Sequence, residues 1–261
     1  MSQSCLSFLK LGTSSGERLI AVRRGGGGAA PGIFWMGGFK SDMKGNKAEA
    51  LAQWAHENGR SCVRFDYSGH GESSGDFTAG TIGGWLEDSL AVFDSEAKGP
   101  QVVVGSSMGG WLALLLVREL RRRKAEGKAA AGTIAGLVLI APAVDFTEVL
   151  MWQRFPATIR QEIETKGVWH RPSDHGEPYP ITRGLIEDGR KHLLLGGMIE
   201  TGCPVRILQG VQDSDVPWNH AVALTSRLAQ DDVVLTLVKD GDHRLSRPED
   251  LERLMRAVAE F

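Results

Sequence analysis

The chain has 261 residues, of which 42% are hydrophobic and 24% are charged, and its formal net charge at pH 7 is −2. This length and composition are typical of one large globular domain with a sizeable core. Nothing in the near-neutral charge suggests nucleic-acid binding, which would need a basic face, and no nucleic-acid partner is expected. Only Cys5, Cys62 and Cys203 are cysteines, and their wide separation excludes a disulfide-stapled scaffold.

Apolar periodicity predicts strands and helices that alternate along most of the chain. Short antiparallel strands are expected at 6–9 and 18–22, and buried strands at 33–36, 61–65, 101–104, 134–140, 204–208 and 233–238. Helices are expected at 48–55, 82–93, 108–122, 221–228 and 251–258, and the four glycines at 25–28 are expected to form a surface loop. The alternation predicts an α/β fold with a mainly parallel sheet and helices on both faces.

Residues 145–201 interrupt this alternation, because they show no strand pattern and contain four prolines. We expect an inserted helical cap here, within a single domain that spans residues 1–261. The cap should lie over the C-terminal edge of the sheet, where ligands bind in open α/β sheets. Its apolar side chains, Trp152, Phe155 and Trp169, are expected to bind the acyl or aryl part of a substrate.

The longest apolar stretch, 102–117, is too short to span a bilayer and is interrupted by glycines and serines. It contains Gly105-Ser106-Ser107-Met108-Gly109-Gly110 between an expected strand and an expected helix. A Gly-x-Ser-x-Gly motif in this setting indicates a nucleophile elbow, a tight turn that lifts one serine hydroxyl above the sheet. Ser107 fits the glycine spacing and Ser106 does not, so Ser107 is the candidate nucleophile.

A serine hydroxyl needs a base that takes its proton, and the base needs an acid that orients it. His243 follows the last expected strand and precedes the last helix, which places it at the same sheet edge. The acid should come from the loop after the strand at 204–208, where Asp213 and Asp215 compete. We favour Asp213 because it lies nearer the strand end, and we expect Asp215 to brace the turn or cap the next helix.

The backbone amides of Phe39 and Met108 are the candidate donors to a developing oxyanion. Phe39 follows two glycines that let the chain bend close to Ser107, and Met108 opens the helix after the elbow. Asp66 also follows a strand, and we expect it to brace its own loop through backbone hydrogen bonds. No residue spacing indicates a metal site, and no cofactor is expected.

Segments 64–69, 105–112, 166–169, 215–218 and 242–244 together resemble the α/β-hydrolase superfamily. Within it, they are most similar to a branch of mitochondrial palmitoyl-protein thioesterases that also cleave acyl-glucuronides. The resemblance implies hydrolysis of esters or thioesters, from small molecules or acylated proteins, with Ser107, Asp213 and His243 as triad. Gly37 stands where that branch tends to have proline, and the N-terminus shows no transit or secretory signal, so we expect a cytoplasmic protein.

Three other functions are compatible with parts of this pattern. An acyltransferase or a carbon–carbon bond hydrolase reuses the same triad on the same fold. A non-catalytic ligand receptor is disfavoured, because such proteins typically lack part of the triad. The sequence leaves the acyl chain, the leaving group and the oligomeric state open.

Overall fold

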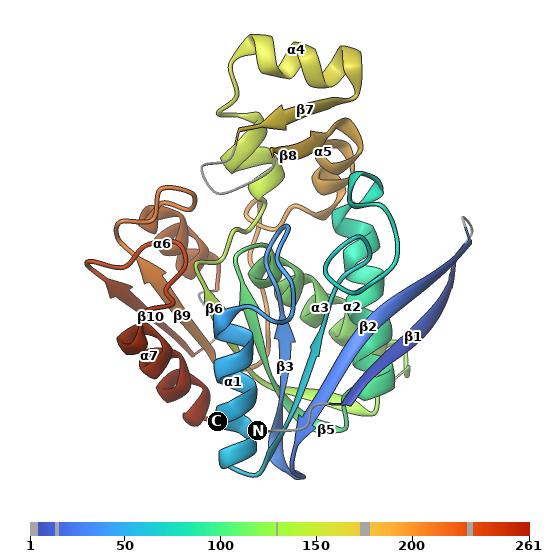
Figure 1. Ribbon diagram of the computed structural model, residues 1–261. Coiled ribbons are helices and arrows are strands. Elements are labelled where there is room, and N and C mark those ends of the chain that lie inside the picture. Colours follow the sequence, from blue (N-terminus) through green and yellow to red (C-terminus); the bar gives the residue numbers. More distant parts are fainter. Residues whose placement is uncertain (1–4, 14–15, 129, 173–177, 229–231) are drawn as a thin grey trace.

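A twisted eight-stranded sheet forms the centre of the computed structural model, which describes residues 5–13, 16–128, 130–172, 178–228 and 232–261 (Figure 1). The strands lie in the order β1 (Cys5–Thr13), β2 (Gly16–Gly26), β4 (Arg60–Phe65), β3 (Ala29–Met36), β5 (Gly99–Ser106), β6 (Gly132–Ile140), β9 (Val205–Gly210) and β10 (Val233–Val238). Within the described residues, the pairs β1–β2 and β2–β4 are antiparallel and the other neighbouring strands of this sheet are parallel.

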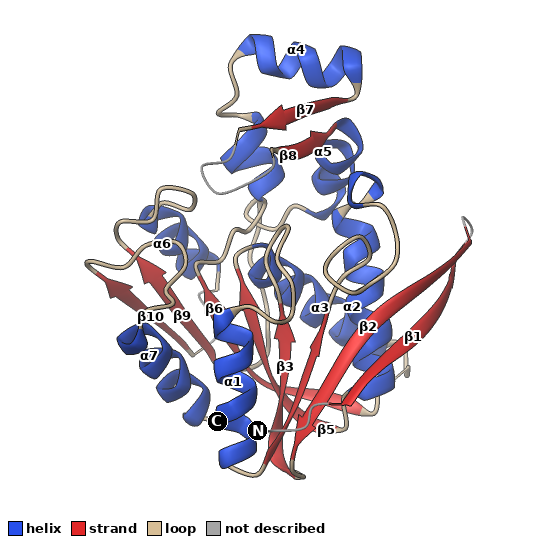
Figure 2. Ribbon diagram, in the orientation of Figure 1, coloured by secondary structure: helices blue, strands red, loops and turns tan. Residues whose placement is uncertain are grey.

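The central strands are almost wholly apolar because helices cover both faces of the sheet (Figure 2). One face is covered by α1 (Asn46–Glu57) and α7 (Pro248–Ala259), whose buried side chains form one core cluster. The other is covered by α2 (Ile82–Glu96), α3 (Met108–Ala125) and α6 (Trp218–Arg227), which share a second cluster. The predicted α/β architecture is confirmed, with element boundaries that differ from the expected ones by a few residues.

The first turns of α3 are buried on every side, from Met108 to Val117. This explains why the stretch 102–117 is so apolar: it joins a central strand to a helix packed in the core. Among the helices of the described residues, none has the length and apolar content needed to cross a membrane.

The four glycines at 25–28 were expected to form a surface loop, but only two of them lie outside a strand. Gly25 and Gly26 end β2, and only Gly27 and Gly28 form the turn to β3. The turn packs tightly against the start of β4. A Cβ on Gly26, whose φ is +83°, would lie 1.9 Å from the carbonyl oxygen of Arg60. Gly26 is therefore required by a close backbone approach, whereas a Cβ on Gly28 would meet no atom within 4 Å.

The cap segment, residues 145–201, lies over the C-terminal edge of the sheet (Figure 1). It contains the π-helical turn η2 (Thr147–Trp152), α4 (Ala157–Lys166), β7 (Val168–Arg171), β8 (Tyr179–Thr182), α5 (Arg183–Gly189) and the short helix η3 (Arg190–His192). The segment contains the expected helices, but the expectation that it has no strand is wrong, because β7 and β8 pair in antiparallel fashion. Gly167, at φ +81°, ends α4 and sends the chain directly into β7.

One buried carboxylate joins the two ends of the cap segment. Asp145 accepts hydrogen bonds from the backbone amides of Leu194 at 2.9 Å and Leu195 at 2.8 Å. The segment therefore leaves the core and returns to it at the same point.

Candidate active site

Ser107 occupies a strained turn between β5 and α3. Its backbone has φ 54° and ψ −117°, an unfavourable conformation for a residue with a side chain. The glycines around it are required by space: a Cβ on Gly105 would lie 2.4 Å from the carbonyl oxygen of Gly109, and one on Gly109 would lie 2.1 Å from that of Met36. The turn therefore has the geometry of the expected elbow.

Ser107, His243 and Asp213 form a continuous hydrogen-bonded line, although they come from three separate loops. The Nε2 atom of His243 lies 3.1 Å from the Ser107 hydroxyl oxygen. Its Nδ1 atom lies 2.7 Å from Oδ2 of Asp213. Since a carboxylate only accepts, Nδ1 carries the ring proton and Nε2 presents a lone pair to the serine. The arrangement therefore leaves His243 ready to take a proton from Ser107.

Asp213 is held by donors on both of its oxygens, and its side chain is fully buried. Oδ1 accepts from the backbone amides of Asp215 at 2.9 Å and Val216 at 2.8 Å. Oδ2 accepts from the side-chain amide of Gln209 at 3.1 Å, besides facing His243. Sequence reasoning missed Gln209, although a glutamine at the end of an expected strand, four residues before Asp213, was a signal for it.

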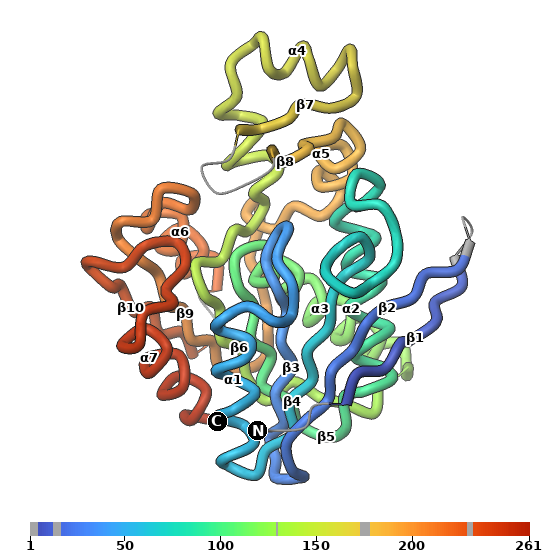
Figure 3. The backbone as a smooth tube through the Cα atoms, viewed as in Figure 1, coloured from blue at the N-terminus to red at the C-terminus, as the bar shows by residue number. Residues whose placement is uncertain are grey.

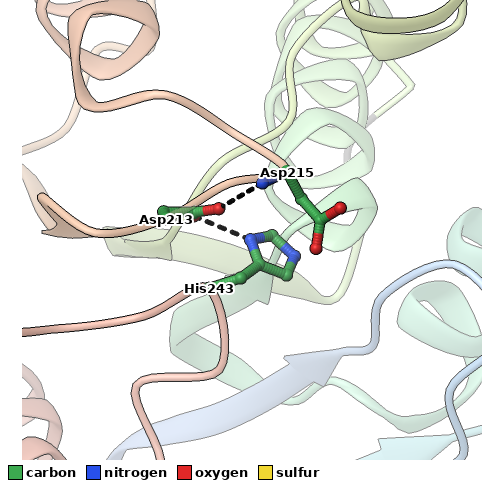
Figure 4. A group of neighbouring side chains, drawn as sticks. All are labelled: Asp213, Asp215 and His243. Atoms are coloured by element: carbon green, nitrogen blue, oxygen red, sulfur yellow. Dashed lines mark hydrogen bonds and ion pairs between the residues drawn. The ribbon is translucent and has the colours of Figure 1, made fainter. Parts of the chain in front are cut away.

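Asp215 points away from Asp213, as Figure 4 shows. Its carboxylate pairs with Arg171 of β7 at 3.5 Å, and both side chains are about half exposed. The position before α6 is held by Pro217, with no side-chain cap, so the expectation that Asp215 caps this helix is wrong. The residue instead connects the loop after β9 to the cap segment.

The ligand atoms of Asp213, Asp215 and His243 lie within 4.8 Å of one another, a spacing that admits a metal ion. The two inner groups are already committed to each other, because Asp213 accepts from the Nδ1 proton of His243. A metal ion at this point would have to displace that proton and the serine contact. The bonds that are present are those of a hydrogen-bonded acid–base pair.

The loop after β3 carries Phe39, and both Phe39 and Met108 line the cavity at Ser107. At Gly38, a Cβ would lie 3.4 Å from the Cβ of Ser107, so this loop passes directly beside the serine. Within the described residues, neither the Phe39 amide nor the Met108 amide donates to a backbone or side-chain acceptor. The oxyanion-hole assignment of these two amides therefore stays a prediction.

A cavity of about 290 Å³ opens at the Ser107 hydroxyl, between the sheet edge and the cap segment. Its lining includes Ser107, Met108, Phe39 and His243 from the core. The cap segment contributes mainly apolar side chains, which are Phe146, Leu150, Met151, Tyr179 and Ile181. Sequence reasoning did not identify these five, because no local pattern marks which apolar cap residues turn toward the sheet.

The three cap residues expected to bind substrate lie outside the lining of this cavity. Phe155 and Trp169 pack edge to face with ring centroids 5.2 Å apart. Arg190 stacks over the ring of Trp152 at 4.9 Å. These contacts hold the parts of the cap segment together.

Comparisons with known proteins agree with this fold. A family model described as alpha/beta hydrolase family matches residues 26–260. The human protein named "Palmitoyl-protein thioesterase ABHD10, mitochondrial" is 36% identical over 233 residues, which cover 88% of this chain and 72% of the human protein.

Two solved structures are similar over almost the whole chain. A protein from Agrobacterium vitis S4 has a TM-score of 0.94 at 45% identity, with 98% of both chains covered. Mouse alpha/beta hydrolase domain-containing protein 10 has a TM-score of 0.84 at 34% identity, with 98% of this chain and 97% of the mouse chain covered.

The expected cytoplasmic location is contradicted by these relatives. The human protein and its counterparts in other mammals are named as mitochondrial. The expectation rested only on the residues at the start of the given sequence.

Proposed function

Because the chain belongs to the alpha/beta hydrolase family, we propose that it is a serine hydrolase that cleaves carboxylic esters or thioesters through an acyl-enzyme on Ser107. One observation carries the proposal: the hydrogen-bonded line from the buried Asp213 through His243 to the Ser107 hydroxyl opens into a cavity to which the cap segment contributes apolar side chains. The curated relatives named as thioesterases support the ester and thioester substrate class. Small acyl compounds and acylated proteins are both included in the proposal.

In the first half of the reaction, the Ser107 oxygen attacks the carbonyl carbon while Nε2 of His243 takes the hydroxyl proton. The resulting imidazolium faces the carboxylate of Asp213, which stabilises its positive charge. The carbonyl oxygen becomes an anion and accepts hydrogen bonds from the amides of Phe39 and Met108. Collapse of this intermediate breaks the bond to the alkoxide or thiolate, and His243 returns the proton to that leaving group.

In the second half, a water molecule replaces the leaving group. His243 takes a proton from the water as its oxygen attacks the acyl carbon bound to Ser107. Collapse of the second intermediate breaks the bond to the serine oxygen, which regains its proton from His243. The products are the free acid and the unchanged enzyme, so no cofactor is needed.

The cavity supports an acyl group as the part of the substrate that is bound. Phe146, Leu150, Met151 and Ile181 offer apolar surface beside the serine, and each buried methylene contributes about 0.8 kcal/mol. We propose these residues for acyl binding in place of Trp152, Phe155 and Trp169, which pack within the cap segment.

Labelling with a fluorophosphonate probe tests the nucleophile. Intact mass should show one adduct on the wild-type chain and none on Ser107→Ala, which should also lose roughly 10⁴- to 10⁶-fold in kcat. Ser106→Ala is the matched control, because Ser106 is the adjacent buried serine, and it should still be labelled. Labelling of Ser107→Ala would contradict the proposal.

Product analysis separates the alternatives that share the triad. A hydrolase releases the free acid from acyl esters and thioesters whether or not an alcohol is added. An acyltransferase would form mainly the new ester, and a non-catalytic receptor would take no label. Either result would replace the function proposed above.

A further inference from the structure

The loop after β4 takes no part in the chemistry proposed above, yet its side chains reach the loop that carries Phe39. We call residues 37–43 the oxyanion loop and residues 66–72 the bracing loop. Figure 3 shows the two beside each other, in blue and cyan, below the cap segment. Asp66, as expected, accepts from backbone amides, those of Met43 at 2.7 Å and Glu72 at 2.8 Å. Its carboxylate therefore ties the two loops together.

Two further contacts lie on either side of Phe39. The hydroxyl of Tyr67 donates to the carbonyl oxygen of Gly37 at 3.2 Å. The Nε2 atom of His70 accepts from the backbone amide of Lys40 at 3.1 Å. The peptide that carries the Phe39 N–H therefore lies between two peptides that are each fixed by a side chain of the bracing loop.

The backbone of the oxyanion loop needs such support. Lys40 has φ 55°, in the left-handed region that a residue with a side chain rarely adopts. A conformation of this kind persists only where the surroundings hold it. The hydrogen bond to His70 is made at Lys40 itself, directly after Phe39.

His70 is in the right state to accept. Its Nδ1 atom lies 3.2 Å from the carbonyl oxygen of Ser68, which requires the ring proton to be on Nδ1. The ring is buried and contacts the rings of Tyr67, Phe77 and Trp85 at centroid distances of 5.0 to 5.6 Å. This burial lowers the pKa of His70 to about 4, so the side chain is neutral at neutral pH and Nε2 keeps its lone pair.

We propose that His70 and Tyr67 are positioning residues that aim the Phe39 N–H at the oxyanion. The inference rests on the proposed function, since it assigns a support to the oxyanion hole. The hole acts on charge that develops in the transition state, so a misdirected donor should lower kcat and leave KM nearly unchanged. A merely structural role would lower stability without this split.

Four variants test the positioning role, with kcat expressed per active site titrated with the fluorophosphonate probe. His70→Leu removes the acceptor at similar volume and should lower kcat about 10- to 100-fold, with KM within about twofold, since full loss of one donor costs 10²- to 10³-fold. His70→Gln can place its amide oxygen near the position of Nε2 and should recover at least half of this loss on a logarithmic scale. Tyr67→Phe, which removes one hydroxyl, should lower kcat severalfold even if His70→Leu does not fold.

Ser73→Ala is the matched control. Ser73 attaches the chain just after the bracing loop to Ala21 and Asp66, and no contact between its side chain and the oxyanion loop is found in the described part of the chain. Its loss should lower the melting temperature and leave kcat per site within about twofold. A boronic acid inhibitor, which mimics the tetrahedral intermediate, should bind His70→Leu more weakly by the same factor as kcat/KM falls.

Three outcomes would overturn the inference: unchanged kcat per site in both His70→Leu and Tyr67→Phe, equal loss in His70→Gln and His70→Leu, or equal loss in Ser73→Ala. Failure of the proposed function is distinguishable, because the wild type would then take no label on Ser107. A wild type labelled on Ser107, with kcat intact in the His70 and Tyr67 variants, refutes the positioning role alone.

Discussion

Replacing Asp213 by asparagine should disable His243 without removing any atom of bulk. The carboxylate of Asp213 accepts from two backbone amides on Oδ1, and faces Gln209 and His243 on Oδ2. An asparagine has one acceptor oxygen and one NH₂ group. If its oxygen stays with the two backbone amides, its NH₂ faces Nδ1 of His243, where 2.7 Å separates the two groups in the wild type.

His243 must then present a lone pair at Nδ1 and carry its proton on Nε2. That proton points at the Ser107 hydroxyl, 3.1 Å away, so the ring can no longer act as base. The comparable change in a serine protease lowers kcat about 10⁴-fold, or ~5.5 kcal/mol, and we expect a similar loss. The opposite amide orientation would leave two buried N–H groups unpaired at about 1–3 kcal/mol each.

The assay is kcat and KM on a short-chain acyl ester, with the melting temperature of the same sample. Asp213→Asn should lose about 10⁴-fold in kcat, while the melting temperature falls by several degrees because Gln209 then faces a second NH₂ group. Asp215→Asn is the control. Its half-exposed pair with Arg171 is worth at most about 1 kcal/mol, so kcat should stay within severalfold. Loss of activity in Asp215→Asn and not in Asp213→Asn would refute this assignment of the acid.

Three further outcomes are expected. Gly109→Ala should lower the free energy of unfolding by several kcal/mol, because its Cβ would lie 2.1 Å from the Met36 carbonyl oxygen. Gly184→Ala in α5, which has open space around it, should instead raise this free energy by about 0.5–1 kcal/mol in urea unfolding. A Gly109→Ala variant of wild-type stability would contradict the packing. His70 takes up a proton near its ordinary pKa of 6.5 in the unfolded chain, but only near pH 4 in the folded chain. The free energy of unfolding should therefore fall by up to about 3 kcal/mol between pH 6.5 and 4. In His70→Gln, the free energy of unfolding should depend less steeply on pH over this range. Among acyl esters, kcat/KM should rise about fourfold per added methylene until the cavity of about 290 Å³ is full, and a flat profile would exclude acyl binding there.

The sheet and the elbow could be predicted because each has a local signature. Buried parallel strands are continuous apolar runs, and the glycines beside Ser107 follow from close backbone contacts that no other residue allows. The choice between Asp213 and Asp215 had no such signature. It depends on which carboxylate meets the backbone amides of 215 and 216 and which one reaches Arg171, and spacing along the chain does not encode this.

The cap segment was the least predictable part for the same reason. The hairpin of β7 and β8 has strands of only four residues, too short for a period of two to stand out, and the prolines in and beside it favoured an irregular interpretation. Which apolar side chains face the serine is decided by how the hairpin and η2 sit on the sheet edge. The aromatic residues singled out from composition proved to pack on one another and on Arg190 instead.

The hydrogen bonds at Asp145 mark a point at which the cap segment could be exchanged, in evolution or by engineering. The backbone amides of Leu194 and Leu195 donate to the carboxylate of Asp145, where the cap segment begins. The residues between these two points therefore form an insertion whose ends are held together at the core. Most of the apolar side chains that line the cavity come from the cap segment, whereas Ser107 and His243 come from the core. Changes confined to the cap segment can therefore alter the shape of the cavity, and with it the substrate range, without changing Ser107 or His243.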